Sequence, residues 1–267
     1  MLVLPTGPKR IVCLTEEPTE ILYALGCAER IVGISAYTVR PPDAKLTKPI
    51  VSAFLDGSVK KIIALKPDLV IGFSDIQADL AKRLVAANLN VMIFNQRSIQ
   101  EIFSVVDQVG AMVHQHAQAK ALILEYQGNL ETIEQAAQKF THRPKVYFEE
   151  WDTPTISGIQ WVSELIEIAG GTDVFAQRSS GKLAKERFVS RDEIYSRAPE
   201  VVFASWCGKP FDQTRFEHRF EDHMLPAIKT GSIYEIPPEI ILQPGPAALT
   251  DGVNMLHALI KSHLLKK

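Results

Sequence analysis

The chain has 267 residues and a formal net charge of −2 at neutral pH, and 46% of its residues are hydrophobic. This length allows one large domain or two of ordinary size, and the composition is that of a globular protein with a sizeable core. The charge gives no reason to expect a nucleic acid or an anionic membrane as a partner. No stretch approaches the roughly 20 apolar residues of a membrane-spanning helix.

The first third of the chain alternates short apolar runs with helical patterns. Helices are expected after Thr15, after Ser58 and over residues 75–87. The apolar runs lack the period of two that marks a strand with one exposed face, so they indicate parallel strands covered on both faces. Residues 1–97 are therefore predicted to form an α/β lobe. Its strands are expected at residues 10–14, 31–34, 69–73 and 91–94.

A long helical stretch follows at residues 98–142. Apolar residues recur at steps of four and three from Val105 to Phe140. Gly110 and the polar run at residues 114–116 are expected to divide the stretch into a short helix and a long one, and the long one would extend roughly 39 Å. It is either one more core helix of a single domain or a rigid connection between two lobes.

The order of the first lobe then restarts, which favours two lobes. A strand at residues 145–148 leads into a loop at 149–158, and further strands are expected at 201–204 and from Ile233. The pattern of helix end, proline, acid and apolar strand around Pro67 recurs around Pro199. The predicted fold class is therefore α/β, with two parallel-sheet lobes (1–97 and 143–267) joined by one long α-helix and a ligand cleft between the lobes.

Ligands of open parallel sheets bind beyond the carboxyl ends of the strands. The loops expected there are rich in aromatic residues, which suit a large, flat, partly apolar ligand. Each ring could instead fill the core of its own lobe, as is expected for Trp161 on the apolar face of a helix. The aromatic loop residues are Tyr37, Phe54, Phe73, Trp151, Trp206 and Phe211.

Signals for catalysis and for metal binding are weak. The chain has no glycine-rich phosphate-binding motif and no nucleophile elbow, and no base is spaced to activate Cys207. We predict no catalytic residue, no intrinsic cofactor and no metal ligand, and we interpret the paired histidines as solvated. The acidic run at residues 149–152 leaves two alternatives, a contact with a cation or ligand and a solvated loop.

Three segments resemble a known family: residues 10–20, residues 64–70, and residues 164–171 with 173–175. They are similar to the helical-backbone substrate-binding proteins of ABC importers, which deliver cobalamin, haem and iron–siderophores. The resemblance covers residues 9–265 and is strongest to the cobalamin-binding members. It implies a protein that is not an enzyme and that closes only slightly when it binds cobalamin or a related corrinoid.

The resemblance also suggests ligand contacts. Tyr37 and Phe54 match segments that contact the corrin ring, and Phe188 would face the ring from the second lobe. Haem or an iron–siderophore remains an alternative, which an arginine lining (Arg40, Arg178, Arg187) would favour. An enzyme or chaperone for such a cofactor would require Glu149, Glu150 and Cys207 to converge. The full set of expected contacts is Tyr37, Phe54, Trp151, Phe188, Trp206, Glu150 and Gln243.

Two departures from the family concern the compartment and the partner. The family is usually exported, whereas the first residues of this chain do not resemble a signal peptide, so periplasmic, surface and cytoplasmic locations stay open. Cobalamin-binding members carry a glutamate on each lobe that meets arginines of the permease. Here the matching residues are Lys60 and Asp192. A lysine repels an arginine where the family attracts one, so Lys60 opposes docking of the expected monomer to a standard ABC permease.

Overall fold

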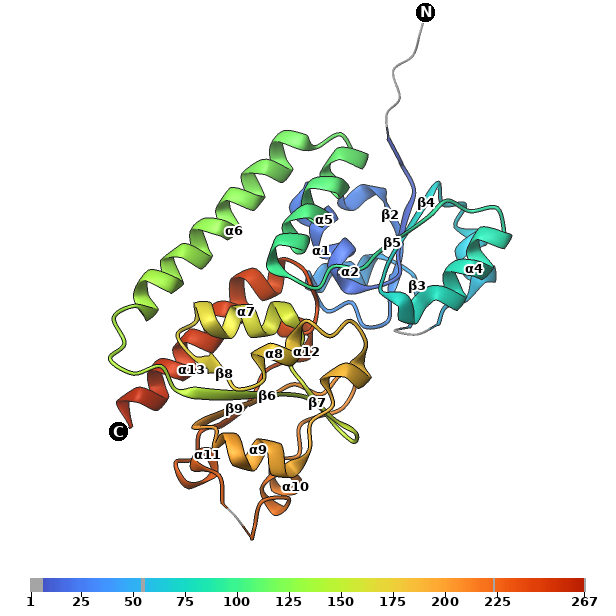
Figure 1. Ribbon diagram of the computed structural model, residues 1–267. Coiled ribbons are helices and arrows are strands. Elements are labelled where there is room, and N and C mark those ends of the chain that lie inside the picture. Colours follow the sequence, from blue (N-terminus) through green and yellow to red (C-terminus); the bar gives the residue numbers. More distant parts are fainter. Residues whose placement is uncertain (1–6, 54–55, 223, 267) are drawn as a thin grey trace, which may run out of the picture. The chain divides into compact units, whose positions relative to one another are not determined.

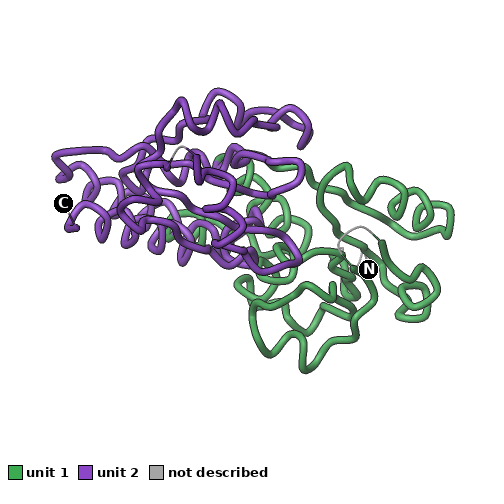
Figure 2. Tube along the Cα trace, turned by 90° about the horizontal axis from the view of Figure 1, so that it is seen from below, with its two compact units in different colours: residues 1–96, 100–125 green, residues 97–99, 126–267 purple. Residues whose placement is uncertain are grey.

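The computed structural model describes residues 7–53, 56–222 and 224–266. The chain divides into two compact units, which we call lobe 1 (residues 1–96 and 100–125) and lobe 2 (residues 97–99 and 126–267). Figure 2 shows the two units in different colours, and each is described here by itself.

Lobe 1 contains a five-stranded parallel sheet with the order β3-β2-β1-β4-β5 (Figure 1). The predicted strands are confirmed, and β3 is an additional edge strand within a segment that the sequence suggested was only a connection. The first strand lies in the centre of the sheet, so the loop that follows it is flanked by other strand ends. The strands are β1 (Ile11–Cys13), β2 (Ile31–Ser35), β3 (Ile50–Ser52), β4 (Leu69–Phe73) and β5 (Val91–Phe94).

Helices cover both faces of this sheet, which explains its continuous apolar strands. Val12, Val70, Ile62 and Leu84 are fully buried in one cluster that joins the strands to two of the helices. Figure 1 shows α1 and α5 on the opposite side of the sheet from α4. The helices are α1 (Glu16–Ala24), α2 (Pro42–Thr47), α3 (Val59–Ala64) and α4 (Ala78–Ala86), with short 3₁₀ turns at Ala28–Arg30 and Asp75–Gln77.

The stretch between the sheets forms two helices, α5 (Ile99–Met112) and α6 (His116–Ala137). The boundary between the units lies within α6, between residues 125 and 126. The predicted division into a short and a long helix is confirmed at the polar run, although α5 continues through Gly110. A Cβ atom at Gly110 would lie 2.4 Å from the Cβ atom of Ala119, so glycine allows the two helices to approach closely. The chain turns near His114, within the predicted polar run, and the φ of this residue is +58°.

Lobe 2 contains a second sheet with the order β10-β9-β6-β7, in which β8 also pairs with β6. All its pairings are parallel except the hairpin of β6 and β7. The expected loop at residues 149–158 is therefore wrong, because β6 continues to Asp152 and returns as β7. The strands are β6 (Lys145–Asp152), β7 (Thr155–Ser157), β8 (Thr172–Asp173), β9 (Val201–Ala204) and β10 (Ile233–Glu235).

Two helical layers enclose the sheet of lobe 2 (Figure 1). A cluster that includes Tyr147, Phe175, Ile194 and Phe216 fills one side. Gly171 lies against Val146, Ile166 and Ile260 on the other side. The helices are α7 (Gln160–Ile168), α8 (Ala176–Ser179), α9 (Arg191–Arg197), α10 (Gln213–His218), α11 (Pro226–Lys229), α12 (Pro238–Ile241), a π-helix (Ala248–Gly252) and α13 (Val253–Leu265), with a 3₁₀ turn at Ala184–Arg187.

The prediction of an α/β protein with two parallel-rich sheets in two lobes is thus confirmed. Trp161 lies in the core of lobe 2 with 3% of its surface exposed, as expected. Within the described part of the chain, no helix combines the length and the apolar character needed to span a membrane.

Candidate functional site

The strand order of lobe 1 brings several loops together at the carboxyl edge of its sheet. Residues 14–17 follow β1, residues 36–41 follow β2, and Ser74 follows β4. This is the edge at which open α/β sheets bind ligands. Phe54, a predicted contact in the loop after β3, lies outside the described residues.

Tyr37 is presented at this edge by a loop that is attached to α1. The tyrosine side chain is 43% exposed. The backbone N–H of Val39 donates to the Glu16 carboxylate over 2.8 Å, and the Arg40 Nε donates to Glu20 over 3.0 Å. Two carboxylates of one helix therefore fix the segment that carries the exposed ring.

A third acid of α1 is buried. Glu17 is only 2% exposed, and Thr15 donates its hydroxyl to Oε1 over 2.8 Å. Oε2 has no hydrogen-bond partner among the described residues. Burial raises the pKa of Glu17 to about 7, because the apolar surroundings disfavour the charged form. This carboxyl group is therefore partly protonated at neutral pH.

The acidic run of lobe 2 lies within strand β6, whose pairing with β7 shifts register between Glu149 and Trp151. Each of its three acids has a basic partner: Glu149 pairs with Arg219, Glu150 with Arg187, and Asp152 with Lys209 and Arg215. No group of three or more potential metal ligands occurs among the residues that the structure describes. The burial of Glu149 (0% exposed) and Asp152 (6% exposed) contradicts a solvated loop, and a contact of these acids with a cation or ligand stays a prediction.

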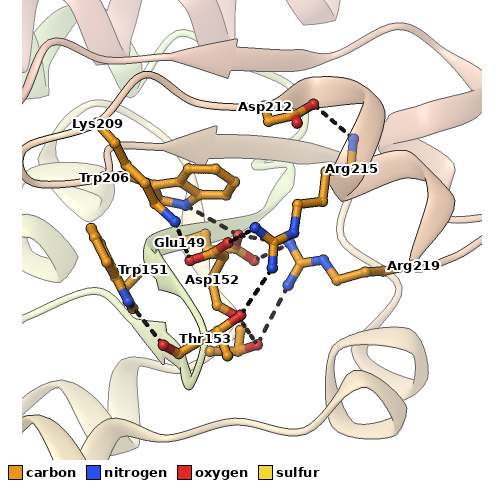
Figure 3. Close-up of polar contacts among 10 residues, drawn as sticks. Glu149, Trp151, Asp152, Thr153, Trp206, Lys209, Asp212, Arg215 and Arg219 are labelled. Atoms are coloured by element: carbon orange, nitrogen blue, oxygen red, sulfur yellow. Dashed lines mark hydrogen bonds and ion pairs between the residues drawn. The ribbon is translucent and has the colours of Figure 1, made fainter.

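Glu149 is the centre of a buried hydrogen-bond network (Figure 3). It has no exposed surface, and its two oxygens accept from Nη2 of Arg219 over 2.7 and 2.8 Å. The Tyr147 hydroxyl donates to it over 3.0 Å, and Nε1 of Trp206 over 3.2 Å. Burial raises the pKa of Glu149, and these donors oppose that shift by stabilising the carboxylate.

Asp152 lies at the end of β6, on the carboxyl edge of the sheet. Its Oδ1 is 2.7 Å from Nζ of Lys209, and its Oδ2 is 3.0 Å from Nη1 of Arg215. Burial alone would raise the pKa of Asp152, but the two cations outweigh it and hold this pKa below its usual value. The carboxylate is therefore ionised at neutral pH.

Phe188 is 40% exposed. The preceding residue, Arg187, anchors the backbone on which Phe188 lies. The Arg187 side chain is 4% exposed, donates both terminal nitrogens to Glu150, and donates to the backbone oxygen of Ser157 over 2.6 Å. Phe188 itself forms a β-bridge with Ile156 of β7. Glu150 thus forms an ion pair within the protein, and this pair positions the segment that carries Phe188.

The other predicted contacts differ in their exposure. Trp206 is 2% exposed and packs edge-to-face on Phe211, so most of its ring belongs to the interior of lobe 2. Trp151 is partly exposed, whereas Gln243 is buried at 7% exposure. The predicted edge aromatics that offer the most surface in the described part of the chain are therefore Tyr37 and Phe188.

The arginines that would support a haem lining are engaged with acids. Arg40 pairs with Glu20, Arg178 pairs with Glu193, and Arg187 pairs with Glu150. The two acids that an enzyme would bring together have different partners, because Glu149 pairs with Arg219 and Glu150 pairs with Arg187.

The two candidate docking residues lie on helices. Lys60 is exposed in the first turn of α3, and Asp192 is exposed in the first turn of α9. The Ser58 and Ser190 side chains accept from backbone N–H groups at the starts of these helices, which confirms the predicted caps.

Sequence reasoning misses the basic partners of the acidic run. It interprets the paired histidines, of which His218 is one, as solvated, and it assigns no role to the neighbouring Arg219. Arg219 instead reaches the fully buried Glu149. The only signal in the sequence is indirect: an acid in an apolar strand needs a cation, but spacing along the chain does not identify it.

Comparisons with known proteins agree with this fold. Residues 11–240 match a family model described as periplasmic binding protein. A vitamin B12-binding protein of Vibrio parahaemolyticus is 24% identical over 90% of this chain and 86% of its own. The periplasmic vitamin B12 binding protein of Vibrio cholerae has a TM-score of 0.72 at 22% identity, covering 97% of this chain and 99% of that one. A periplasmic haem-binding protein of Roseiflexus, in its apo form, has a TM-score of 0.76 at 21% identity, covering 95% and 100%.

Proposed function

Because this chain belongs to the periplasmic binding protein family, a family of non-catalytic ABC-type substrate-binding proteins, we propose that its ligand is cobalamin or another corrinoid. The observation that carries the proposal is the pair of exposed rings, Tyr37 and Phe188, each at the carboxyl edge of one lobe's sheet. Aromatic faces of this kind suit a broad macrocycle. The relatives named as vitamin B12-binding proteins support the same choice.

The charges of the two edges also favour a corrinoid over a strongly charged chelate. The acids and arginines at these edges neutralise one another, as in the pairs Glu20–Arg40 and Glu150–Arg187. A guanidinium that already has a carboxylate partner gains little from a ligand carboxylate, because it must lose the first interaction. Recognition at these edges would then depend on shape and apolar contact.

Haem is the second candidate, and a similar solved structure is a haem-binding protein. Tyr37, which is 43% exposed, would favour it, because phenolate oxygen is one of the axial ligands of haem iron. One experiment separates the candidates: titration of the purified protein with cyanocobalamin and with haemin, followed by tryptophan fluorescence and by the visible spectrum of the ligand.

We expect saturable quenching by cyanocobalamin at micromolar concentration or below. Tyr37→Ala and Phe188→Ala should each weaken binding about tenfold, which corresponds to about 1.4 kcal/mol. Tyr195→Ala is the matched control, because Tyr195 is equally exposed (44%) but lies towards the end of α9. A spectral shift with haemin and no response to cyanocobalamin would favour haem, and equal losses in all three variants would remove Tyr37 and Phe188 from the site.

A permease partner is proposed on the same basis. Lys60 on α3 and Asp192 on α9 are both exposed but carry opposite charges. A partner that fits both would offer an acid opposite Lys60 and a base opposite Asp192. Lys60→Glu should therefore slow transport by the chain's own permease and leave ligand affinity unchanged. Faster transport by the variant would show that the partner carries arginines at both positions.

A further inference from the structure

A lysine ammonium lies between two indole rings at the carboxyl edge of lobe 2 (Figure 3). Nζ of Lys209 is 4.3 Å from the ring centroid of Trp151 and 4.6 Å from that of Trp206. The same nitrogen is 2.7 Å from Oδ1 of Asp152. Two aromatic faces and one carboxylate therefore surround a single cation, and we call Trp151, Trp206 and Asp152 the cage.

Each wall of the cage is held by a contact that does not involve Lys209. Trp151 donates its indole N–H to the backbone oxygen of Thr153 over 3.0 Å. Trp206 donates to the buried Glu149 over 3.2 Å, and its ring is 2% exposed. Arg215 reaches the second oxygen of Asp152 over 3.0 Å. The cage should therefore keep its shape when the lysine side chain is shortened.

Lys209, in contrast, comes from a weakly held loop. It follows Gly208, which has a φ of +84° and no atom within 4 Å of the place that a Cβ atom would take. The Lys209 N–H contacts the Trp206 carbonyl at the long distance of 3.5 Å. The lysine side chain remains 35% exposed. The occupant is thus attached less firmly than the walls.

We propose that the cage is a binding subsite for an ammonium or quaternary ammonium group, and that Lys209 occupies it as an internal ligand. Indole faces attract cations through their quadrupole, and a desolvated carboxylate adds an ionic contact, so this combination is selective for a positive charge. Lys209 is then a specificity-determining residue that keeps external cations out of this edge of lobe 2. The inference goes beyond the proposed function and does not depend on which macrocycle is bound.

The test uses tetramethylammonium as the probe and tryptophan fluorescence as the readout. Wild-type protein should not respond, whereas Lys209→Ala should bind the probe with millimolar affinity. Trp151→Ala in the Lys209→Ala background should abolish that binding, and Lys209→Met should not bind, because its longer side chain still fills the cage. Lys182→Ala, which removes an exposed lysine of the same lobe, is the matched control and should behave like wild type.

A neutral probe separates a cation site from a simple apolar hole. Lys209→Ala should bind choline at least tenfold more tightly than 3,3-dimethyl-1-butanol, which has nearly the same shape without the charge. Equal affinity for the two probes, or no response from a folded Lys209→Ala protein, would overturn the proposal. Binding of tetramethylammonium to wild-type protein with the variant's affinity would also overturn it, because Lys209 would then not be the occupant.

A measurement on the unaltered protein avoids any effect of substitution on folding. Acetic anhydride acetylates exposed amines, and peptide mass spectrometry measures the rate at each lysine. A caged ammonium that is paired with Asp152 should react at least ten times more slowly than the exposed Lys182. Equal rates at the two lysines would show that Lys209 spends most of its time outside the cage.

Discussion

Glu149→Ala should strongly destabilise lobe 2, because this side chain accepts every hydrogen bond at the centre of a buried network. Without it, the Tyr147 hydroxyl (0% exposed) and the Trp206 N–H (2% exposed) lose their acceptor. Arg219, whose side chain is 23% exposed, loses its carboxylate. An alanine leaves no group that could replace any of these contacts.

The magnitude follows from these lost partners. Each buried polar group left without a partner costs about 1–3 kcal/mol, and removing one member of a buried ion pair costs about 3–5 kcal/mol. The terms overlap, and the variant no longer has to desolvate the Glu149 carboxylate, so we expect a total of about 4 kcal/mol. Glu149→Gln keeps one acceptor oxygen and should cost less, about 2 kcal/mol.

Urea unfolding followed by tryptophan fluorescence is the appropriate assay, since all three tryptophans of the chain (Trp151, Trp161 and Trp206) lie in lobe 2. Glu131→Ala, which removes an exposed acid from α6, is the control and should change the free energy of unfolding by less than about 0.5 kcal/mol. Arg219→Met added to Glu149→Ala should restore part of the stability, because no unpaired charge then remains. A cost below about 1 kcal/mol for Glu149→Ala would refute the reasoning.

Three further predictions concern stability. The pKa of Glu17 is about 7 in the folded protein and 4.5 in the unfolded chain. Between these two pH values the folded protein holds a proton that the unfolded chain has lost, so the contribution of Glu17 to stability falls as the pH rises. Relative to Glu17→Gln, the wild-type protein should therefore lose about 3 kcal/mol from about pH 4.5 to about pH 8 in urea titrations, and a constant difference would contradict this. Gly128→Ala should stabilise the protein by about 0.5–1 kcal/mol, because this helical site has no neighbour within 4 Å of an added Cβ atom. Gly110→Ala should destabilise it by about 1–3 kcal/mol, because the added Cβ atom meets Ala119, and equal effects of the two substitutions would show that α5 and α6 do not approach as described. Ser190→Ala should cost about 1 kcal/mol in thermal unfolding because it removes the cap of α9, and no change would mean that water replaces the cap.

The elements that sequence predicted well are those with a strong local signal. The strands around Val12 and Val70 are continuous apolar runs followed by helical patterns, so hydrophobicity and periodicity agree. The polar run at residues 114–116 correctly predicted where the long stretch divides into two helices. The part of this prediction assigned to Gly110 failed because the sequence does not show that Ala119 packs there, and this contact explains the glycine. The β6–β7 hairpin was missed because its acids discourage a strand assignment unless their partners are known.

The candidate site was predictable in location but less so in detail. The strand assignments predict Tyr37 in a loop at the carboxyl edge, whereas Phe188 was suggested only by the resemblance to the family. Whether a ring is exposed depends on packing, which is why Trp206 turned out to be buried against Phe211. The functions of Glu150 and Lys209 depend on partners 37 and 57 residues away, and no periodicity connects such positions.

Ion pairs have a similar role at the carboxyl edges of both lobes. In lobe 1, Arg40 and Glu20 hold the segment of Tyr37, and in lobe 2, Arg187 and Glu150 hold the segment of Phe188. An exposed ring on a loose loop would lose conformational entropy on binding, and this cost lowers affinity. A ring on a segment fixed by a partly buried ion pair has lost much of that freedom when the protein folds. Under the proposed function, charge at these edges would stabilise the arrangement in which the rings bind, and the apolar faces would recognise the ligand.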